Sequence, residues 1–313
     1  MKKFVLTAAA AAVSLGLGVG AASAAEALKA PSKTWSFSGV FGTYDQAQLQ
    51  RGYQVYKQVC ASCHGMDLIA FRNLADLGYN EDELKAIAAE YEVTDGPDEF
   101  GDMFDRPARL SDYFPSPFAN AQAAAAANGG AAPPDLSLVA KARVGGPDYL
   151  YALLTGYEDD VSEEVLQQIF ETETHKREVQ HAAAMEAYEV RLAKFQEKVK
   201  TDPTAKEPAM PEDPGPVQSV EDLGLPDTAS FNAYFPGYGI AMAPPLSEDI
   251  VEYADGTPAT LSNLSADVSA FMMWAAEPTM DQRKQMGIKV ILFLLVFTGI
   301  LYAAKRKCWA DVH

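Results

Sequence analysis

The stretch Cys60-Ala61-Ser62-Cys63-His64 constrains this chain more than any other feature. Two cysteines two residues apart, followed at once by a histidine, form the attachment pattern of a c-type haem. Each thiol can form a thioether to one vinyl group of the same porphyrin, and the adjacent imidazole can then reach the iron from one face. The pattern predicts one covalently bound haem c, attached through Cys60 and Cys63, with His64 as an iron ligand.

A membrane-tethered thiol–disulfide exchanger is the competing interpretation of the same two cysteines. That motif belongs in a βαβ context and needs no histidine, whereas the residues before Cys60 predict a helix. Covalent haem would leave no thiols for exchange, so a pyridine haemochrome spectrum separates the two. A third interpretation, a haem sensor or peroxidase with an open iron position, depends on whether a second iron ligand exists.

The composition of the chain limits which compartment it occupies and which partners it binds. Residues 1–24 hold a short basic start, an alanine-rich apolar run too short for a membrane span and a small-residue cleavage site, as in a secretory signal peptide. The formal net charge of −18 excludes nucleic acid as a ligand and favours a basic protein partner, although acidity also serves solubility. Cys308 has no partner once haem takes the other two cysteines, so we expect no structural disulfide.

A second apolar run lies near the C-terminal end. Residues 286–304 are apolar on every side of a helix and reach the roughly 20 residues that span a hydrocarbon core. Lys289 interrupts the run in its first turn, where its aliphatic stem can carry the charge to the interface. Three cations follow at once, which places residues 305–313 in the cytoplasm. We expect a single membrane helix in the bacterial inner membrane and a periplasmic haem domain over residues 25–285; a buried core helix is the alternative.

Helical patterns frame the haem motif. Asp45 can cap a helix that runs up to the motif, and Gln48 would complete a capping box. Gly52 lies on the apolar stripe of this helix, where another helix could approach closely. Pro147 starts a second helix with Tyr149 on its apolar face, and we expect this to be the partner of the first.

Shorter helices are expected at four further places: residues 81–91, 121–127, 135–143 and from Ser265 or Asp267 onward. The last is expected to kink at Pro278 before the membrane span. The remainder of residues 95–134 is punctuated by proline and glycine and predicts a loop, of a length that usually lines a ligand.

Residues 158–230 differ in character from their surroundings. Up to about residue 200 the charge is dense and of both signs, which predicts one long or two shorter solvated helices. Five prolines in residues 201–216 exclude helix and indicate extended chain. We interpret the block as an insertion in the haem domain. His175 and His181 lie off one helix face and are expected to be solvated rather than ligands.

The segment 231–246 supplies a candidate for the second iron ligand. Proline and glycine keep it out of helix, yet it is too apolar for an ordinary surface loop, so a porphyrin face would suit it. Met242 would offer the thioether that pairs with histidine in cytochromes of high potential. Met103, on another loop, is a rival, and a methionine that only fills the core is the simplest alternative.

Together these motifs resemble the cytochrome c1 family, the haem subunits of bacterial cytochrome bc1 complexes. The resemblance covers nearly the whole mature chain apart from the insertion and rests on six segments: Cys60 to His64, Pro133 to Ser137, Ala142 to Gly146 with Tyr149, Phe235 to Pro245, Phe271 to Pro278, and Met286-Gly287. It implies a mostly α, cytochrome c-like (class I) fold in which the Gly52 helix crosses the Tyr149 helix. It also implies that His64 and Met242 are the axial ligands and that Arg143 and Tyr149 meet the haem propionates.

The resemblance implies a function and a set of partners as well. In the family, a Rieske iron–sulfur protein reduces this haem after quinol oxidation at cytochrome b, and a c-type cytochrome, basic or membrane-anchored, takes the electron away. Such a subunit relays single electrons and makes or breaks no bond in a substrate. The expected assembly is a dimeric complex of a respiratory or photosynthetic chain in the lipid bilayer.

Overall fold

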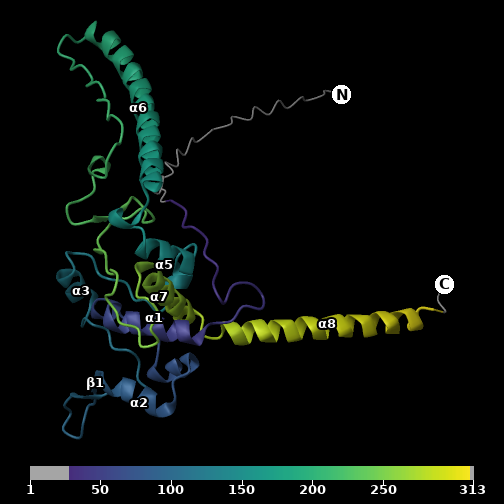
Figure 1. The fold of residues 1–313 in the computed structure, drawn as a ribbon. Helices are drawn as coiled ribbons and strands as arrows, with labels where there is room; N and C mark the ends of the chain where they lie inside the picture. Colours follow the sequence, from purple (N-terminus) through teal and green to yellow (C-terminus); the bar gives the residue numbers. More distant parts are fainter. Residues whose placement is uncertain (1–27, 311–313) are drawn as a thin grey trace, which may run out of the picture.

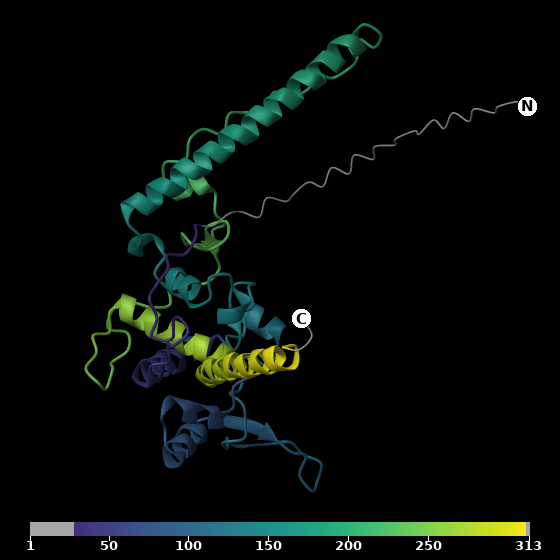
Figure 2. The ribbon, with the colours of Figure 1, turned by 90° about the vertical axis from the view of Figure 1, so that its right-hand side faces the viewer.

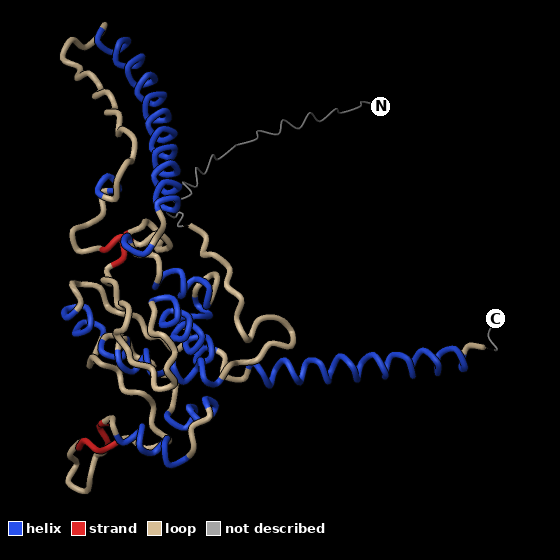
Figure 3. The backbone as a smooth tube through the Cα atoms, viewed as in Figure 1, coloured by secondary structure: helices blue, strands red, loops and turns tan. Residues whose placement is uncertain are grey.

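The computed structural model describes residues 28–310, so the expected signal peptide lies outside the described residues. Within that range the chain is mostly helical, with two short two-stranded ribbons (Figure 3), which confirms the mostly α fold class. A helical body carries the Cys-x-x-Cys-His motif. Helix α6 projects from this body, and helix α8 leaves it in another direction (Figures 1 and 2).

Helix α1, Gln46–Gln58, leads directly into the haem motif. Asp45 caps it as expected, because its carboxylate accepts hydrogen bonds from backbone N–H groups of the first turn at 3.0 and 3.3 Å. The expected capping box is wrong, since the amide of Gln48 donates to the carboxylate of Asp267, at 3.1 Å. This residue reaches across to another helix instead of back to its own cap.

Helix α7, Leu261–Ala276, lies at the centre of the body. Thr260 caps it by accepting a hydrogen bond from the N–H of Asn263 at 3.2 Å, so the helix begins before its predicted start at Ser265 or Asp267. Its sides are buried because α1 packs on one of them and α5, Pro147–Leu154, on another. The predicted start was late because Thr260 lies in a polar connection, where a capping residue is harder to recognise than the apolar run that follows it.

Gly52 is where α1 and α7 come close together. A Cβ atom on Gly52 would lie 2.1 Å from the carbonyl oxygen of Asp267 and 2.7 Å from Cβ of Phe271. Beside this contact the guanidinium of Arg51 binds the buried carboxylate of Asp267 at 2.8 Å. The prediction that the Gly52 helix crosses the Tyr149 helix is therefore wrong, because α7 is the partner of both. A glycine on an apolar helix face predicts that another helix approaches closely, but it does not identify that helix.

Aromatic rings fill the core between α1, α7 and the segment after the haem motif. Tyr53 and Tyr56 pack against Phe271 with ring centroids 5.7 and 5.8 Å apart, and Phe114 lies against both tyrosines. Small elements surround this cluster: η2, Phe71–Leu77; α2, Glu81–Ala89; α3, Ala121–Ala127; and α4, Val139–Ala142. The last is shorter than the helix predicted over 135–143.

Residues 95–134 are not all loop, contrary to the prediction. Strand β1, Glu92–Asp95, pairs antiparallel with β2, Phe104–Pro107. Arg106 holds the ribbon by pairing with the carboxylates of Asp95 at 2.5 Å and Asp112 at 2.6 Å. Four-residue strands carry too little period to be found in a sequence. The two ion pairs of Arg106 join β2 to β1 and to the residues that follow.

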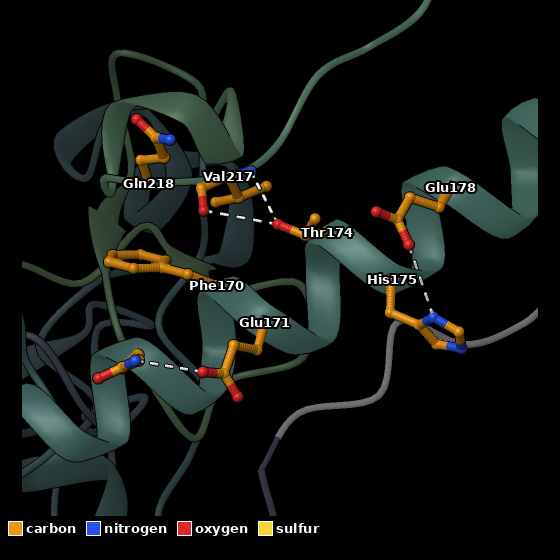
Figure 4. Close-up of a pocket in the computed structure, with 8 residues that line it drawn as sticks. Phe170, Glu171, Thr174, His175, Glu178, Val217 and Gln218 are labelled. Atoms are coloured by element: carbon orange, nitrogen blue, oxygen red, sulfur yellow. Dashed lines mark hydrogen bonds and ion pairs between the residues drawn. The ribbon is translucent and has the colours of Figure 1, made fainter.

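Helix α6, Glu163–Val199, forms an arm that projects from the body (Figures 1 and 2). The sequence allowed one long or two shorter helices, and the structure has one. The proline-rich residues 201–216 that follow contain no helix, as predicted, and begin with a turn at residues 201–204. The base of the arm is fixed, because the N–H of Val217 donates to Oγ1 of Thr174 at 2.8 Å (Figure 4). Ile169 is buried there, in an apolar cluster on the short ribbon of β3, Ser230–Phe231, and β4, Gly239–Ile240.

Helix α8, Met280–Cys308, leaves the body as one extended element (Figures 1 and 3). Within residues 28–310 it is the one helix long and apolar enough to cross a membrane. Pro278 does not kink a continuous helix as predicted; α7 ends at Ala276 and α8 begins after the proline. The apolar side chains of the predicted span 286–304 are exposed, Leu295 to 65% of its surface.

Candidate haem-binding site

The two motif cysteines lie in a tight turn at the end of α1. Element η1, Cys60–Ser62, follows the helix directly, and the N–H groups of Cys63 and His64 both donate to the carbonyl of Cys60, at 3.1 and 2.9 Å. Both thiols are free, and Cys60 packs against the main core. The turn therefore presents two thiols and an imidazole together at the edge of an apolar core, the donor set that a covalent haem requires.

The imidazole of His64 is oriented by a backbone carbonyl. Its Nδ1 lies 2.7 Å from the carbonyl oxygen of Pro134. A carbonyl oxygen only accepts hydrogen bonds, so Nδ1 carries the hydrogen and Nε2 keeps its lone pair for a metal. Ligating histidines commonly have this second hydrogen bond, which fixes both tautomer and ring orientation.

The segment 133–137 holds the chain on the far side of the motif. The N–H of Leu136 donates to the carbonyl of Gly65 at 2.9 Å, and the carboxylate of Asp135 accepts from the N–H of Asp67 at 2.8 Å. The hydroxyl of Ser137, which is fully buried, accepts from the N–H of Leu68 at 3.1 Å. These contacts explain why a Pro-Pro-Asp-Leu-Ser run accompanies the haem motif.

The segment that carries Met242 is held in place by a hydrogen bond to its backbone. Met242 is half-buried and packs against the same core cluster as Cys60 and Ala61. The hydroxyl of Tyr157, itself 3% exposed, donates to the carbonyl of Met242 at 3.1 Å. Burial raises the pKa of Tyr157 above its ordinary value, so this hydroxyl keeps its proton and remains a donor.

The rival methionine is placed differently. Met103 lies in the loop between β1 and β2, is 61% exposed, and its sulfur lies beside Gly96 of the same loop. Met66 is fully buried in the core. Of the three, only Met242 is both half-buried and packed against the core cluster that holds the haem motif.

Arg143 and Tyr149 flank a turn made by two glycines. Gly145 and Gly146 have φ of 92° and 54°, which favour glycine, and a Cβ on Gly145 would lie 3.3 Å from Cβ of Tyr149. Burial raises the pKa of Tyr149, and the positive charge of Arg143 acts in the opposite direction. Within residues 28–310 no carboxylate pairs with Arg143, which is exposed. A guanidinium beside a phenol is a suitable anchor for carboxylates.

Comparison with known proteins decides the family. The sequence model of the Cytochrome C1 family matches residues 35–312. The chain belongs to the Cytochrome C1 family. It is 46% identical over 278 residues to "Cytochrome c1" of Rhodospirillum rubrum, covering 89% of this chain and 86% of that protein. It is 39% identical over 285 residues to "Cytochrome c1, heme protein, mitochondrial" of Saccharomyces cerevisiae, covering 91% of this chain and 74% of the yeast protein.

A third relative is longer. The chain is 43% identical over 291 residues to "Cytochrome b/c1" of Bradyrhizobium diazoefficiens, which covers 91% of this chain but 36% of that protein. Membership in the Cytochrome C1 family confirms the haem c cofactor and the electron-transport role predicted from the motif at Cys60 to His64.

Family membership and geometry both count against thiol–disulfide exchange. Burial, and after it the neighbouring Cys63, raise the pKa of the Cys60 thiol to about 12. An exchanging cysteine needs the opposite, a thiolate at neutral pH, because the thiolate is the nucleophile. Within residues 28–310 the motif follows an α-helix, with no βαβ unit around it.

Sequence reasoning missed two residues that hold the candidate ligands His64 and Met242 in place. Pro134 acts through its backbone carbonyl, which no sequence pattern reports, although the resemblance included its segment. Tyr157 lies three residues beyond the end of α5, and its partner lies 85 residues away in the chain. A tyrosine in an apolar stretch signals burial, not the carbonyl that its hydroxyl contacts.

Two hollows in the surface are lined by residues outside the haem motif. One of about 440 Å³ opens at the base of the arm, lined by residues that include Phe170, Thr174, His175 and Val217 (Figure 4). Several of its polar groups contact one another: Thr174 bonds to Val217, Gln167 donates to Glu171 at 3.2 Å, and His175 lies 3.9 Å from Glu178. His175 is largely exposed, as predicted, and the hollow has no link to the haem motif.

Proposed function

We propose that this chain is the membrane-anchored haem subunit that relays single electrons within a quinol-oxidising bc1 complex. Cys60 and Cys63 would hold the porphyrin, and His64 and Met242 would ligate its iron from opposite faces. The observation that carries the proposal is the hydrogen bond from His64 to the carbonyl of Pro134, because it leaves one imidazole nitrogen for iron beside two free thiols.

The bound haem would supply one iron that cycles between ferric and ferrous states. The chain's residues set how readily it does so. The thioether of Met242 favours ferrous iron because sulfur is a soft ligand, which raises the reduction potential. Tyr157 holds the backbone that carries this sulfur. The apolar core against which Cys60 and Met242 pack would help to exclude water from the bound haem.

Arg143 and Tyr149 would bind the haem propionates. A guanidinium donates two parallel hydrogen bonds to one carboxylate, and a phenol adds a third donor. Two observations support the proposal: the double-glycine turn lies between the two residues, and no carboxylate among the described residues pairs with Arg143. These bonds would help to hold the haem in one orientation.

We propose that α8 anchors the haem domain, residues 25–285, to the bacterial inner membrane. The exposed apolar surface of the span 286–304 supports this, since such a surface is costly in water. Lys305 to Lys307 in its last turn favour a cytoplasmic C-terminal end for residues 305–313 and a periplasmic haem domain. The proposed signal peptide, residues 1–24, agrees with that orientation.

The proposed partners follow from the family and the charge. The relative named "Cytochrome b/c1" and another named "Cytochrome b-c1 complex catalytic subunit, mitochondrial" support assembly with cytochrome b. A Rieske iron–sulfur protein would deliver the electron, and a basic or membrane-anchored c-type cytochrome would remove it. The net charge of −18 suits a basic acceptor, whose encounter it would accelerate. The complex is proposed to be dimeric.

Replacing Met242 tests the ligand assignment. Met242→Leu should lower the reduction potential by on the order of 0.1 V, a fraction of the roughly 0.8 V range that axial ligands control. The reduced variant should also bind carbon monoxide, which the parent should not. Met103→Leu is the matched control and should leave both properties unchanged. An unchanged potential in Met242→Leu, or carbon monoxide binding by the parent, would contradict the assignment and favour a haem with an open iron position.

A further inference from the structure

We propose that residues 37–42 form a second lipid contact beside α8, in which Val40 and Phe41 insert into the interfacial region of the bilayer. The proposal rests on the membrane anchor proposed above and goes beyond it, because it assigns lipid contact to the haem domain itself. The turn would fix the tilt of the domain on the membrane surface.

The turn exposes two adjacent apolar side chains. Phe41 is 83% exposed and Val40 is 63% exposed, whereas Trp35 and Phe37, a few residues earlier, are buried. A single exposed apolar residue is ordinary. Two large neighbours at the tip of a turn beside a membrane helix form a surface that an apolar phase would cover favourably.

The turn is rigid before it meets any partner. The ammonium of Lys284 on α8 donates to the carbonyl oxygens of Phe37 at 2.5 Å and of Gly42 at 2.9 Å, which are the two ends of the turn. A Cβ on Gly42 would lie 2.1 Å from the carbonyl oxygen of Ser38, so only glycine closes it. Little conformational entropy remains to be lost when the tip inserts.

The position of the turn places it at the membrane boundary. Lys284 lies two residues before Met286, where the exposed apolar surface of α8 begins. The turn is therefore within one lysine side chain of that boundary. Figure 1 shows the purple segment looping out beside the start of α8, on the side toward which the helix leaves. Insertion of the tip needs no rearrangement of the body.

The charges around the turn suit a lipid surface. Arg283, Lys284 and Lys289 lie on the first turns of α8, and the nearby carboxylate of Asp281 accepts a hydrogen bond from the N–H of Tyr44 at 3.2 Å. Arg283 is paired with Glu277 and Lys284 with the turn itself, so Lys289, which is exposed, is the cation of the three that is left for an anionic headgroup. An apolar tip beside this lysine, continuous with a lipid-facing helix, matches a bilayer better than a polar protein surface.

The test uses spin labels on the full haem-loaded chain in vesicles of phosphatidylethanolamine and phosphatidylglycerol. In a Cys308→Ser background, single labels are placed through Phe41→Cys, Val179→Cys and Leu295→Cys. Val179, 56% exposed on the arm, is the aqueous control, and Leu295 is the lipid control. Collision with oxygen, which concentrates in lipid, is compared with collision with a water-soluble nickel chelate, and the haem is kept reduced so that it is diamagnetic.

The label at position 41 should favour oxygen over nickel several-fold relative to the label at 179. Equal preference at 41 and 179, with the label at 295 in lipid, would overturn the lipid contact and leave the anchor standing. Shielding of position 41 from both reagents would assign the turn to a protein partner and also overturn it. An aqueous label at 295 would overturn the anchor, and with it this proposal.

Discussion

Removing the hydroxyl of Tyr157 should weaken the attachment of the Met242 backbone without changing the proposed ligand side chain. The hydroxyl donates to the carbonyl of Met242 at 3.1 Å and lies 3.5 Å from that of Ala243. Tyr157→Phe keeps the buried ring and removes only these contacts. If Met242 ligates the iron, the change should raise the fraction of molecules in which the sulfur is dissociated.

The size of the effect follows from the surroundings of the carbonyl. A net hydrogen bond contributes about 1 kcal/mol, and a carbonyl stranded away from water costs more. Met242 is half-buried and Ala243 is exposed, so water can reach the freed carbonyls and the lower figure applies. A loss of about 1 kcal/mol changes an equilibrium about five-fold, so dissociation of the sulfur should increase about five-fold.

Titration of the ferric protein with imidazole measures this directly, because imidazole takes the iron only when the sulfur is off. The apparent Kd for imidazole should fall about five-fold in Tyr157→Phe. Tyr151→Phe is the matched control: it also removes a hydroxyl from a hydrogen bond, to Ser262 at 3.0 Å, without a contact to the Met242 segment. An unchanged Kd in Tyr157→Phe, or an equal fall in Tyr151→Phe, would refute the reasoning.

Two further predictions concern the body. Gly52→Ala should destabilise the fold by about 1 to 3 kcal/mol in denaturant unfolding, because its new Cβ would meet backbone of α7, whereas Gly287→Ala, with nothing within 4 Å, should be neutral; equal effects would contradict the close approach. Burial pushes the pKa of Glu277 up, but its bonds to Lys141 and Arg283 outweigh this and hold it below 4.5, so the stabilisation is present at neutral pH and is lost as pH falls through the lowered pKa. Glu277→Gln should therefore lower the thermal midpoint at about pH 7, and its difference from the parent should shrink as the pH falls below 4.5. A difference that stays constant as the carboxylate of the parent is protonated would contradict the assignment.

The sequence predicted best what depends on local chemistry. The Cys60 to His64 motif, the cap at Asp45 and the apolar span 286–304 each follow from a few adjacent residues. Family membership confirms the haem that the motif predicts, and the structure has the cap and one long apolar helix over the span. The proline-rich extension over 201–216 belongs to the same class, because a proline removes a helical donor wherever it stands.

Long-range pairings were the part that sequence reasoning could not reach. Gly52 predicted that another helix approaches closely, but the helices over 147–154 and 261–276 both have apolar faces. The structure shows that α7 packs against both α1 and α5. The position of Gln48 in the sequence fits a capping box, but in the fold its amide donates to Asp267, which is distant in the chain. Arg106 closes the β1–β2 ribbon through carboxylates before and after it, a pairing with no period in the sequence.

The carboxylate of Glu277 connects the proposed site to the proposed anchor. It binds Lys141 on α4 at 2.7 Å and the guanidinium of Arg283 on α8 at 2.5 Å, and its side chain is 14% exposed. Lys141 lies two residues before Arg143, so the turn proposed to hold the propionates and the first turns of the membrane helix share one ion cluster. Because Pro278 interrupts the helical backbone just there, side chains rather than a continuous helix fix the angle between domain and anchor. The distance of the proposed haem from the membrane surface thus depends on this cluster, and a loosened cluster should broaden that distance before it alters the iron ligands.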